Sequence, residues 1–284
     1  MARAGGIIDR LRSEIRKAGV YQRAKVSWIY DVYWTLADRQ IVDDKRREIE
    51  FYRNVLSGFR PGNLIFDVGA NIGYKADIFL RLGAYVVAAE PDQSCQRILR
   101  QKFLEYRFKK KPLMLVGKAV SDGSSAQRMW VDTPGSAKNT LSAKWADALR
   151  SDDSRFGEKL DFAKSIEVET VSVDQLIATY GEPFYVKIDV EGFELNVLRG
   201  MRQAVPYVSF EVNLPEFEPE GLECVRTLGR NWPNCVFNYT PDCRDGLALS
   251  QWLGSEEFLP VISACHATSI EVFCKTPIRG TTVS

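Results

Sequence analysis

Two short segments of the sequence carry the residues that could do chemistry. The first is DVGANIG, from Asp67 to Gly73, and the second is KIDVEGFE, from Lys187 to Glu194. Glycine permits tight turns and a close approach of a ligand to the backbone, whereas clustered carboxylates can accept a proton or bind a cation. The sequence therefore predicts a ligand site beside a glycine turn, with acids close by that could move a proton.

Both segments have to be positioned by strands, and the sequence predicts a parallel sheet for this purpose. Short apolar runs alternate with amphipathic segments from Leu64 onward, which is typical of an α/β fold with helices on both faces of the sheet. We predict strands at residues 64–68, 85–90, 113–116, 184–190 and 207–213, with a final strand at 269–275 that is antiparallel and lies at one end of the sheet. Ligands bind beyond the carboxyl ends of such strands, where both segments lie. The predicted fold is Rossmann-like and doubly wound, with a mostly parallel sheet.

The spacing of the glycine turn indicates the kind of cofactor. Gly69 and Gly73 are spaced GxxxG, so the GxGxxG fingerprint of dinucleotide sites is not matched and a cofactor without phosphate fits better. S-adenosylmethionine is such a cofactor, and its ribose needs a carboxylate acceptor. Glu90 ends the second predicted strand and could accept hydrogen bonds from both ribose hydroxyls, whereas Asp92 could cap the next helix.

The motifs also follow the order and spacing of a known family. DVGANIG, Glu90 followed by Pro91, AVSD at 119–122, VSVDQLI from Val171 and KIDVEGFELNVLRG from Lys187 together resemble the FkbM-type methyltransferases over residues 50–215. The resemblance implies the class I methyltransferase fold, S-adenosylmethionine as methyl donor, and a hydroxyl on a saccharide or natural product as acceptor. It also implies a set of cofactor-binding residues, namely Asp67, Gly69, Asn71, Gly73 and Glu90, with Ser121 nearby.

The acids of the second segment are the candidates for catalysis. The resemblance implies that Asp189, Glu191 and Glu194 face the transferred methyl and the acceptor. Methyl transfer from a sulfonium mainly needs an aligned acceptor oxygen that loses its proton, so we predict Asp189 as the base. Lys187 is predicted as a hydrogen-bond donor or as a charge that offsets the acids.

A metal is the alternative role for these acids. Asp189, Glu191 and Glu211 lie at adjacent predicted strand ends and could bind Mg²⁺. We favour catalysis without metal because sites for hard cations usually carry denser Asp clusters, although the sequence does not decide between the two. His266 is the only histidine, and its position late in the chain favours a structural role.

Two other functions share parts of this pattern. An oxidoreductase or epimerase that uses NAD also places an acid after the second strand, but the missing GxGxxG and the missing YxxxK dyad argue against it. A non-catalytic cofactor-binding module would keep the fold without turnover, but the acids are intact. Nucleic acid is not a predicted partner, because the formal net charge is +1 and neither a basic, aromatic-rich surface nor an NPPY-like motif is present. The predicted partner is a small-molecule or glycan acceptor.

The remaining sequence predicts how the chain is organised. We expect an N-terminal helical extension at residues 1–60, a methyltransferase domain at 61–284, and a lid or insertion at 122–165, where a strand at 126–131 is followed by a polar stretch. The extension contains a basic amphipathic helix at 3–25, which docks on the domain or touches a membrane surface or partner, and a helix from Asp43 to Gly58.

Compartment and local charge complete the predictions. Six dispersed cysteines without a CxxC pair, no signal peptide and no apolar span of about 18–20 residues predict a cytoplasmic protein with reduced thiols. The oligomeric state is not indicated. Lys75 lies at a predicted helix start, where its charge opposes the helix dipole, so we expect compensation, for example by the cofactor carboxylate.

Overall fold

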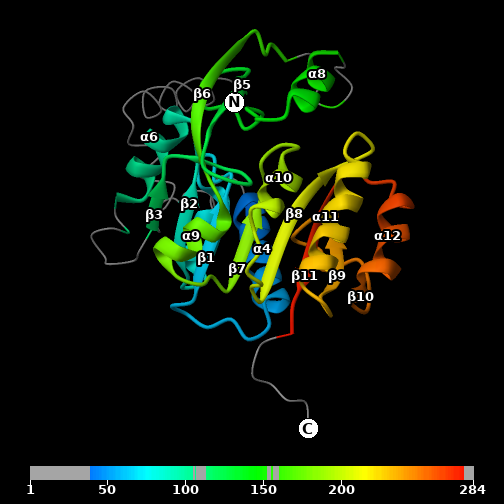
Figure 1. Cartoon of the computed structure of the whole chain (residues 1–284). Helices are drawn as coiled ribbons and strands as arrows, with labels where there is room; N and C mark the ends of the chain where they lie inside the picture. The colour runs from blue at the N-terminus through cyan, green and yellow to red at the C-terminus, as the bar shows by residue number, and fades with distance from the viewer. Residues whose placement is uncertain (1–38, 105, 107–112, 152–154, 156–159, 278–284) are drawn as a thin grey trace, which may run out of the picture.

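The structure is a computed structural model of the chain that describes residues 39–104, 106, 113–151, 155 and 160–277. Its centre is a sheet of eight strands in the order β10-β9-β11-β8-β7-β1-β2-β3, with helices against both faces (Figure 1). The predicted fold class, a doubly wound α/β fold with a mostly parallel sheet, is confirmed.

Six of the eight strands of this sheet agree closely with the predicted apolar runs, whereas the two between residues 236 and 254 were not predicted. The eight strands are β1 (Leu64–Val68), β2 (Tyr85–Ala89), β3 (Leu113–Val116), β7 (Tyr185–Ile188), β8 (Tyr207–Asn213), β9 (Val236–Thr240), β10 (Leu253–Gly254) and β11 (Ser269–Lys275). Strands β3, β2, β1, β7 and β8 are parallel. Strand β11 is antiparallel to both β8 and β9, and this orientation agrees with the prediction. Its predicted position at one end of the sheet is wrong, because it lies between these two strands.

Alternating side chains of the strands face two helical layers. One layer contains α4 (Arg39–Val55), α5 (Tyr74–Arg81) and α6 (Gln93–Lys102), and the other contains α9 (Val173–Tyr180), α10 (Glu194–Arg199), α11 (Glu218–Asn231) and α12 (Ser255–Ser263). In β1, Ile65 faces the first layer, whereas Phe66 and Val68 face the second. Because both faces are covered, the strands are mostly apolar, with buried charged residues only at a few positions such as Asp67 and Lys187.

The predicted N-terminal extension is described only in part. Helix α4 has already begun at Arg39, so Asp43 lies within it and does not cap it, and the helix ends at Val55 instead of Gly58. The basic helix predicted at residues 3–25 lies outside the described residues, and the domain boundary after residue 60 stays a prediction. In the described part of the chain, no helix has the length and apolar character needed to cross a bilayer.

A second, small sheet lies over the carboxyl ends of β1, β2 and β7 (Figure 1). It contains β4 (Ala119–Val120), β5 (Ala126–Val131) and β6 (Lys164–Val171), and β5 pairs with β6 in antiparallel register. Helix α8 (Ala143–Ser151) lies on the same side of the main sheet as this small sheet (Figure 1). Residues 122–165 therefore hold the predicted strand and an unpredicted helix, and the lid function of this segment stays a prediction.

Candidate active site

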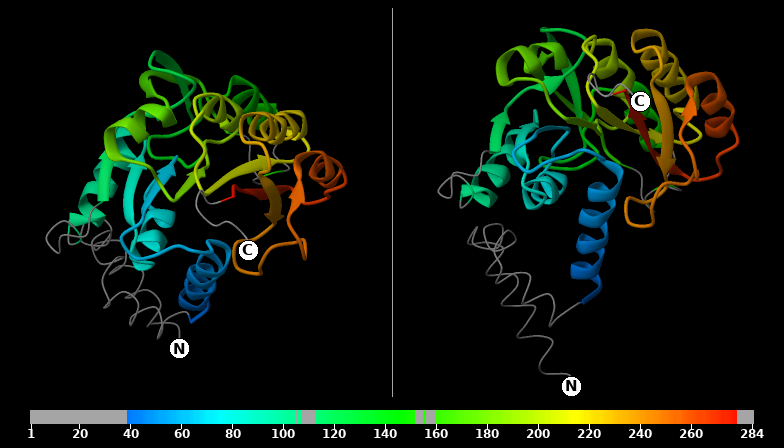
Figure 2. Two further views of the ribbon diagram at one scale, coloured as in Figure 1. Left: turned by 60° about the horizontal axis from the view of Figure 1, so that its bottom comes forward. Right: turned by 90° about the horizontal axis from the view of Figure 1, so that it is seen from below.

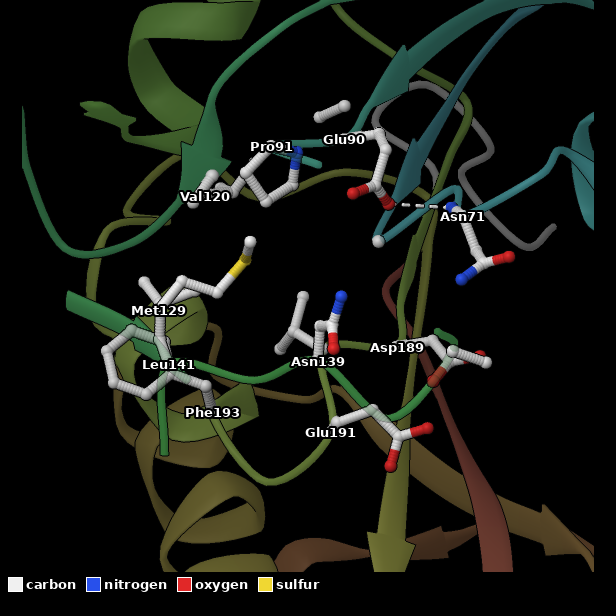
Figure 3. Close-up of a pocket in the computed structure, with 15 residues that line it drawn as sticks. Asn71, Glu90, Pro91, Val120, Met129, Asn139, Leu141, Asp189, Glu191 and Phe193 are labelled. Carbon is white, nitrogen blue, oxygen red and sulfur yellow. Dashed lines mark hydrogen bonds between the residues drawn. The ribbon is translucent and has the colours of Figure 1, made fainter. Parts of the chain in front are cut away.

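The carboxyl ends of β1, β2 and β7 meet at a small cavity, which we call the turn cavity (Figure 3). Five of the predicted site residues line it, namely Gly69, Asn71, Glu90, Asp189 and Glu191. Strands β4 and β5 and the loop between β5 and α8 contribute the apolar side chains of Val120, Met129 and Leu141. The structure thus brings together residues that are more than a hundred positions apart in the sequence.

The glycine turn is required by a close approach of two loops. Gly69 has a φ of 80°, and a Cβ atom on it would lie 1.7 Å from the carbonyl oxygen of Asp189. No other residue fits there, because the loops after β1 and β7 pass in contact. Asn71 follows with a φ of 47°, a left-handed conformation that Asn tolerates better than most residues.

Glu90 is held by backbone amides at the edge of the turn cavity. The N–H of Asn71 donates to its Oε2 at 2.8 Å and the N–H of Asp92 donates to its Oε1 at 2.7 Å. Burial raises the pKa of Glu90 to about 7, although these hydrogen bonds act in the opposite direction. Asp92 caps α6 by accepting from the N–H of Ser94, as the sequence had suggested, whereas the role of Glu90 toward a ribose stays a prediction.

Three residues predicted to hold the cofactor, namely Asp67, Gly73 and Ser121, lie outside the turn cavity. A Cβ atom on Gly73 would lie 2.5 Å from Leu99 and 2.6 Å from Phe103, so this glycine lets α5 approach α6. The buried hydroxyl of Ser121 contacts the carboxylate of Asp122 at 3.1 Å, and Ala119 and Val120 line the cavity in its place. The expectation of direct cofactor contacts from Gly73 and Ser121 is not supported by their positions.

A row of buried charges lies behind the turn cavity. Asp67 on β1 is opposite Lys187 on β7, and Lys187 Nζ donates to Asp189 Oδ2 at 2.7 Å. Burial raises the pKa of Asp67 to about 6, and its Oδ2 has no hydrogen-bond partner among the described residues. Asp67 does not line the turn cavity, so it faces Lys187 and not the predicted ligand position.

Lys187 is a buried cation that keeps Asp189 ionised. Its side chain is 3% exposed, and it both donates a hydrogen bond to Asp189 and offsets the charge of this acid, the two roles that the sequence had left open. Burial alone would lower the pKa of Lys187, but Asp189, Glu271 and Asp67 raise it above its usual range. Burial alone would also raise the pKa of Asp189, and the charge and hydrogen bond of Lys187 outweigh this effect and hold it below its usual range.

Glu191 receives contacts from the segment predicted as a lid. Trp145 Nε1 donates to its Oε2 at 2.9 Å, and Lys138 Nζ lies 3.6 Å from its Oε1. The hydroxyl of Thr140 donates to the carbonyl oxygen of Glu191 at 2.7 Å. Burial raises the pKa of Glu191. Sequence reasoning did not identify these partners, because they come from a polar stretch without a recognisable motif.

Glu194 contacts the backbone of the loop that follows β7. Its Oε1 accepts hydrogen bonds from the N–H groups of Val190 and Gly192, at 3.1 and 3.2 Å. Burial raises the pKa of Glu194 to about 8. It lines neither the turn cavity nor the neighbouring cavity that Asp189 also borders, so its position does not support the expectation that it faces the acceptor.

The compensation of Lys75 also differs from the expectation. Its ammonium pairs with Glu48 of α4 and lies 5.4 Å from the centre of the Tyr52 ring. The predicted partner, a cofactor carboxylate, is therefore not needed to balance this charge. Helix α4 supplies the balance, and nothing in the sequence near Lys75 indicated that contact.

The predicted metal alternative has a geometric basis. Asp189, Glu191 and Glu211 each offer a carboxylate oxygen, and these oxygens lie within 4.8 Å of one another. Burial, followed by the charges of Asp189 and Glu191, raises the pKa of Glu211 to about 8. Either a proton or a cation would relieve this repulsion.

His266 is exposed and does not line the turn cavity.

The residues around the turn cavity fit a cofactor with a ribose and a base but no phosphate. Glu90 offers a carboxylate to a diol, Met129 and Leu141 offer apolar contacts to a flat ring, and none of the described lining residues is Lys or Arg. The cavity volume is about 50 Å³. Ligand sites usually hold about 300–1,000 Å³, so a cofactor needs more room than the turn cavity offers in this conformation.

Sequence comparison identifies related proteins. The profile of the family described as "Methyltransferase FkbM domain" matches residues 67–239. Hexuronic acid methyltransferase AglP from Haloferax volcanii is 28% identical over 174 residues, which are 60% of this chain and 63% of that protein. The chain therefore matches less than two thirds of the length of this curated relative.

Comparison with solved structures gives more distant similarities. A SAM-dependent O-methyltransferase from Thermotoga maritima aligns with a TM-score of 0.43 and 10% identity, over 83% of this chain and 66% of that chain. A TehB-like SAM-dependent methyltransferase from Corynebacterium glutamicum aligns with a TM-score of 0.42 and 9% identity, over 88% and 100%. Similarity at this level carries no argument about the reaction or the acceptor.

Proposed function

Because the chain belongs to the FkbM methyltransferase family, we propose that it transfers a methyl group from S-adenosylmethionine to a hydroxyl of a saccharide or another small molecule. One observation carries this proposal: Glu90 and Asp189 line the same cavity from the ends of two strands that flank β1. A diol-binding carboxylate and a proton-accepting carboxylate are the two groups that this reaction needs.

The cofactor roles follow from the side chains that line the turn cavity. S-adenosylmethionine, when bound, supplies a methyl group on a positively charged sulfur. Glu90 is the residue we assign to the ribose hydroxyls, since the two amide donors fix the direction of its carboxylate. Met129 and Leu141 are assigned to the adenine because they form the apolar wall.

Asp189 is assigned to the acceptor hydroxyl. Its low pKa makes it a weak base, so it accepts a hydrogen bond from the hydroxyl first and takes the proton as the oxygen becomes acidic during bond formation. Lys187 is a positioning residue that keeps this carboxylate charged and aligned. Glu194 positions the same loop through its two backbone contacts.

Catalysis without metal remains our preferred mechanism. The charge of Asp189 is already balanced by Lys187, so the loop does not need a cation to keep this acid ionised. A Mg²⁺ ion shared by Asp189, Glu191 and Glu211 is the alternative. Turnover that requires Mg²⁺ after treatment with a chelator would favour the alternative.

The acceptor and the compartment are supported more indirectly. AglP is named for methylation of a hexuronic acid, which favours a sugar acceptor over other hydroxyl compounds. All six cysteines are free thiols, as the predicted cytoplasmic location requires. The family match argues against the oxidoreductase alternative, whereas a non-catalytic binding module is excluded only by measured turnover.

The proposal is tested by titration calorimetry followed by a transfer assay. S-adenosylmethionine and S-adenosylhomocysteine are expected to bind the purified chain, and NAD is not. Transfer of a labelled methyl group to sugar glycosides, with the product resistant to mild alkali as an ether is, would support O-methylation. Binding of NAD alone would overturn the proposal, as would transfer to nitrogen or carbon but not to oxygen.

A further inference from the structure

A second cavity shares the lining residue Asp189 with the turn cavity. Its volume is about 410 Å³, and we call it the acidic cavity because five carboxylates line it. These belong to Glu48, Asp189, Glu211, Asp242 and Glu271. Helix α4 and the loop that follows β9 lie side by side in both views of Figure 2 and form its outer wall, joined by the ion pair of Arg244 with Asp44 at 2.7 Å.

Asp189 lines both cavities, but their other lining residues differ. The turn cavity offers Glu90 and apolar side chains, whereas the acidic cavity offers charged and hydroxyl groups. A hydroxyl held in the acidic cavity would lie beside Asp189, which also lines the cavity of the predicted cofactor residues. Transfer in line requires the acceptor oxygen to approach the methyl carbon from the side opposite the sulfur, which two cavities that meet at one carboxylate allow.

We propose that the acidic cavity is the acceptor site, an inference that rests on the proposed function. We also propose that it takes a neutral or amino-bearing saccharide in preference to a uronic acid, which differs from the hexuronic acid in the name of AglP. Its volume lies within the usual range of small-molecule sites. Thr240, Ser269 and Tyr74 add hydroxyl groups to the carboxylates, whereas Pro241, Cys243 and Ile270 are its only apolar side chains among the described lining residues. Such a lining suits a ring with several hydroxyls better than a flat apolar molecule.

The charges that line the acidic cavity are the reason why we expect a uronic acid to bind weakly. Two cations line the cavity, and each is already paired with an acid. Lys75 pairs with Glu48, and Arg244 pairs with Asp242, with Nε 2.8 Å from Oδ1. A ligand carboxylate would therefore lose its hydration without gaining an unpaired cation from the described lining residues.

An ammonium or a neutral hydroxyl would meet acceptors instead. Glu271 accepts hydrogen bonds from Ser209 at 2.5 Å and from Cys243 at 3.1 Å, and Glu211 accepts from Ser269 at 2.7 Å. No cation pairs directly with Glu211 or Glu271 among the described residues, although Lys187 and Lys75 act on Glu271 from a greater distance. The field inside the cavity thus favours positive or neutral groups.

The test uses three methyl glycosides that differ in one substituent: methyl β-glucoside, methyl β-glucosaminide and methyl β-glucuronide. Their binding to the full chain is measured by calorimetry in the presence of saturating S-adenosylhomocysteine, and their methylation is measured with labelled S-adenosylmethionine. We expect the glucuronide to bind roughly tenfold or more weakly than the other two, and to be methylated with a correspondingly lower kcat/KM.

Two matched variants locate the discrimination in this cavity. Asp242→Asn releases Arg244 from one partner, so the penalty on the glucuronide should fall by roughly threefold or more. Asp245→Asn makes the same charge change in the same loop, but Asp245 pairs with Arg47 and does not line the acidic cavity. Asp245→Asn should leave the ratio unchanged.

The outcomes separate this inference from the proposed function. If methyl transfer to a sugar hydroxyl occurs but the glucuronide is preferred, or if both variants act alike, the acceptor assignment is wrong and the function stands. If S-adenosylhomocysteine binds but none of the three glycosides does, the assignment is also wrong. If neither cofactor form binds, the proposed function fails, and the acceptor assignment fails with it.

Discussion

Replacing Glu90 with glutamine is expected to weaken cofactor binding while removing a pH-dependent loss of stability. The carboxylate is 7% exposed, and burial raises its pKa to about 7 from the usual 4.5. A raised folded-state pKa means that the protonated carboxyl stabilises the fold fully below pH 4.5 and that this contribution is lost as the pH rises through 7. Glutamine does not titrate, so the variant escapes this loss.

The magnitudes follow from linkage and from the hydrogen bonds. Between pH 5 and pH 8 the wild-type protein should lose about 2.5 kcal/mol of unfolding free energy relative to Glu90→Gln. At pH 8 the variant lacks the charge that accepts two ribose hydroxyls, so its affinity for S-adenosylhomocysteine should fall by about 1–3 kcal/mol, or roughly 5- to 150-fold. The same residue thus costs stability in order to bind the cofactor.

Urea unfolding of both proteins without ligand at pH 5 and pH 8, with calorimetry at pH 8, measures the two effects. Glu256→Gln is the matched control, because Glu256 is exposed on α12 and lines neither of the two cavities. It should change neither quantity. A stability difference between wild type and Glu90→Gln that is the same at both pH values would refute the reasoning from burial, and unchanged affinity would remove Glu90 from the cofactor site.

Three further predictions address the loop, the turn and the lid. Asp189→Asn should keep the affinity for S-adenosylhomocysteine but lower the single-turnover rate by about 10²- to 10⁴-fold, and a normal rate would reject Asp189 as the base. Gly69→Ala should lower the unfolding free energy by about 3 kcal/mol, because its Cβ would overlap a carbonyl oxygen. Gly62→Ala, at a φ of 95° in open space, should cost only about 1 kcal/mol, and equal losses in urea unfolding would contradict the argument from contact. Asn139→Ala removes the 2.9 Å hydrogen bond to Asp92 that ties the lid to α6, so stopped-flow measurements should show roughly threefold or faster cofactor association. An unchanged association rate would argue against a lid that must open.

The sequence by itself determined six of the eight strands of the main sheet, the glycine turn and the capping of α6 by Asp92. These features depend on local rules, because a buried strand needs a continuous apolar run and a helix start needs a capping side chain. The family motifs added the carboxylates of the loop after β7. For that reason Gly69, Glu90 and Asp189 could be placed at one sheet edge before the structure was known.

Tertiary structure alone decided what surrounds those residues. Strand β11 lies between β8 and β9, which brings Glu271 into the network of Lys187. Helix α4 supplies Glu48 to Lys75, and the loop after β9 supplies Arg244. These contacts join segments far apart in the chain, and the packing of helices and strands selects them. No local pattern encodes such a choice, so the acidic cavity could not be predicted from the residues that form it.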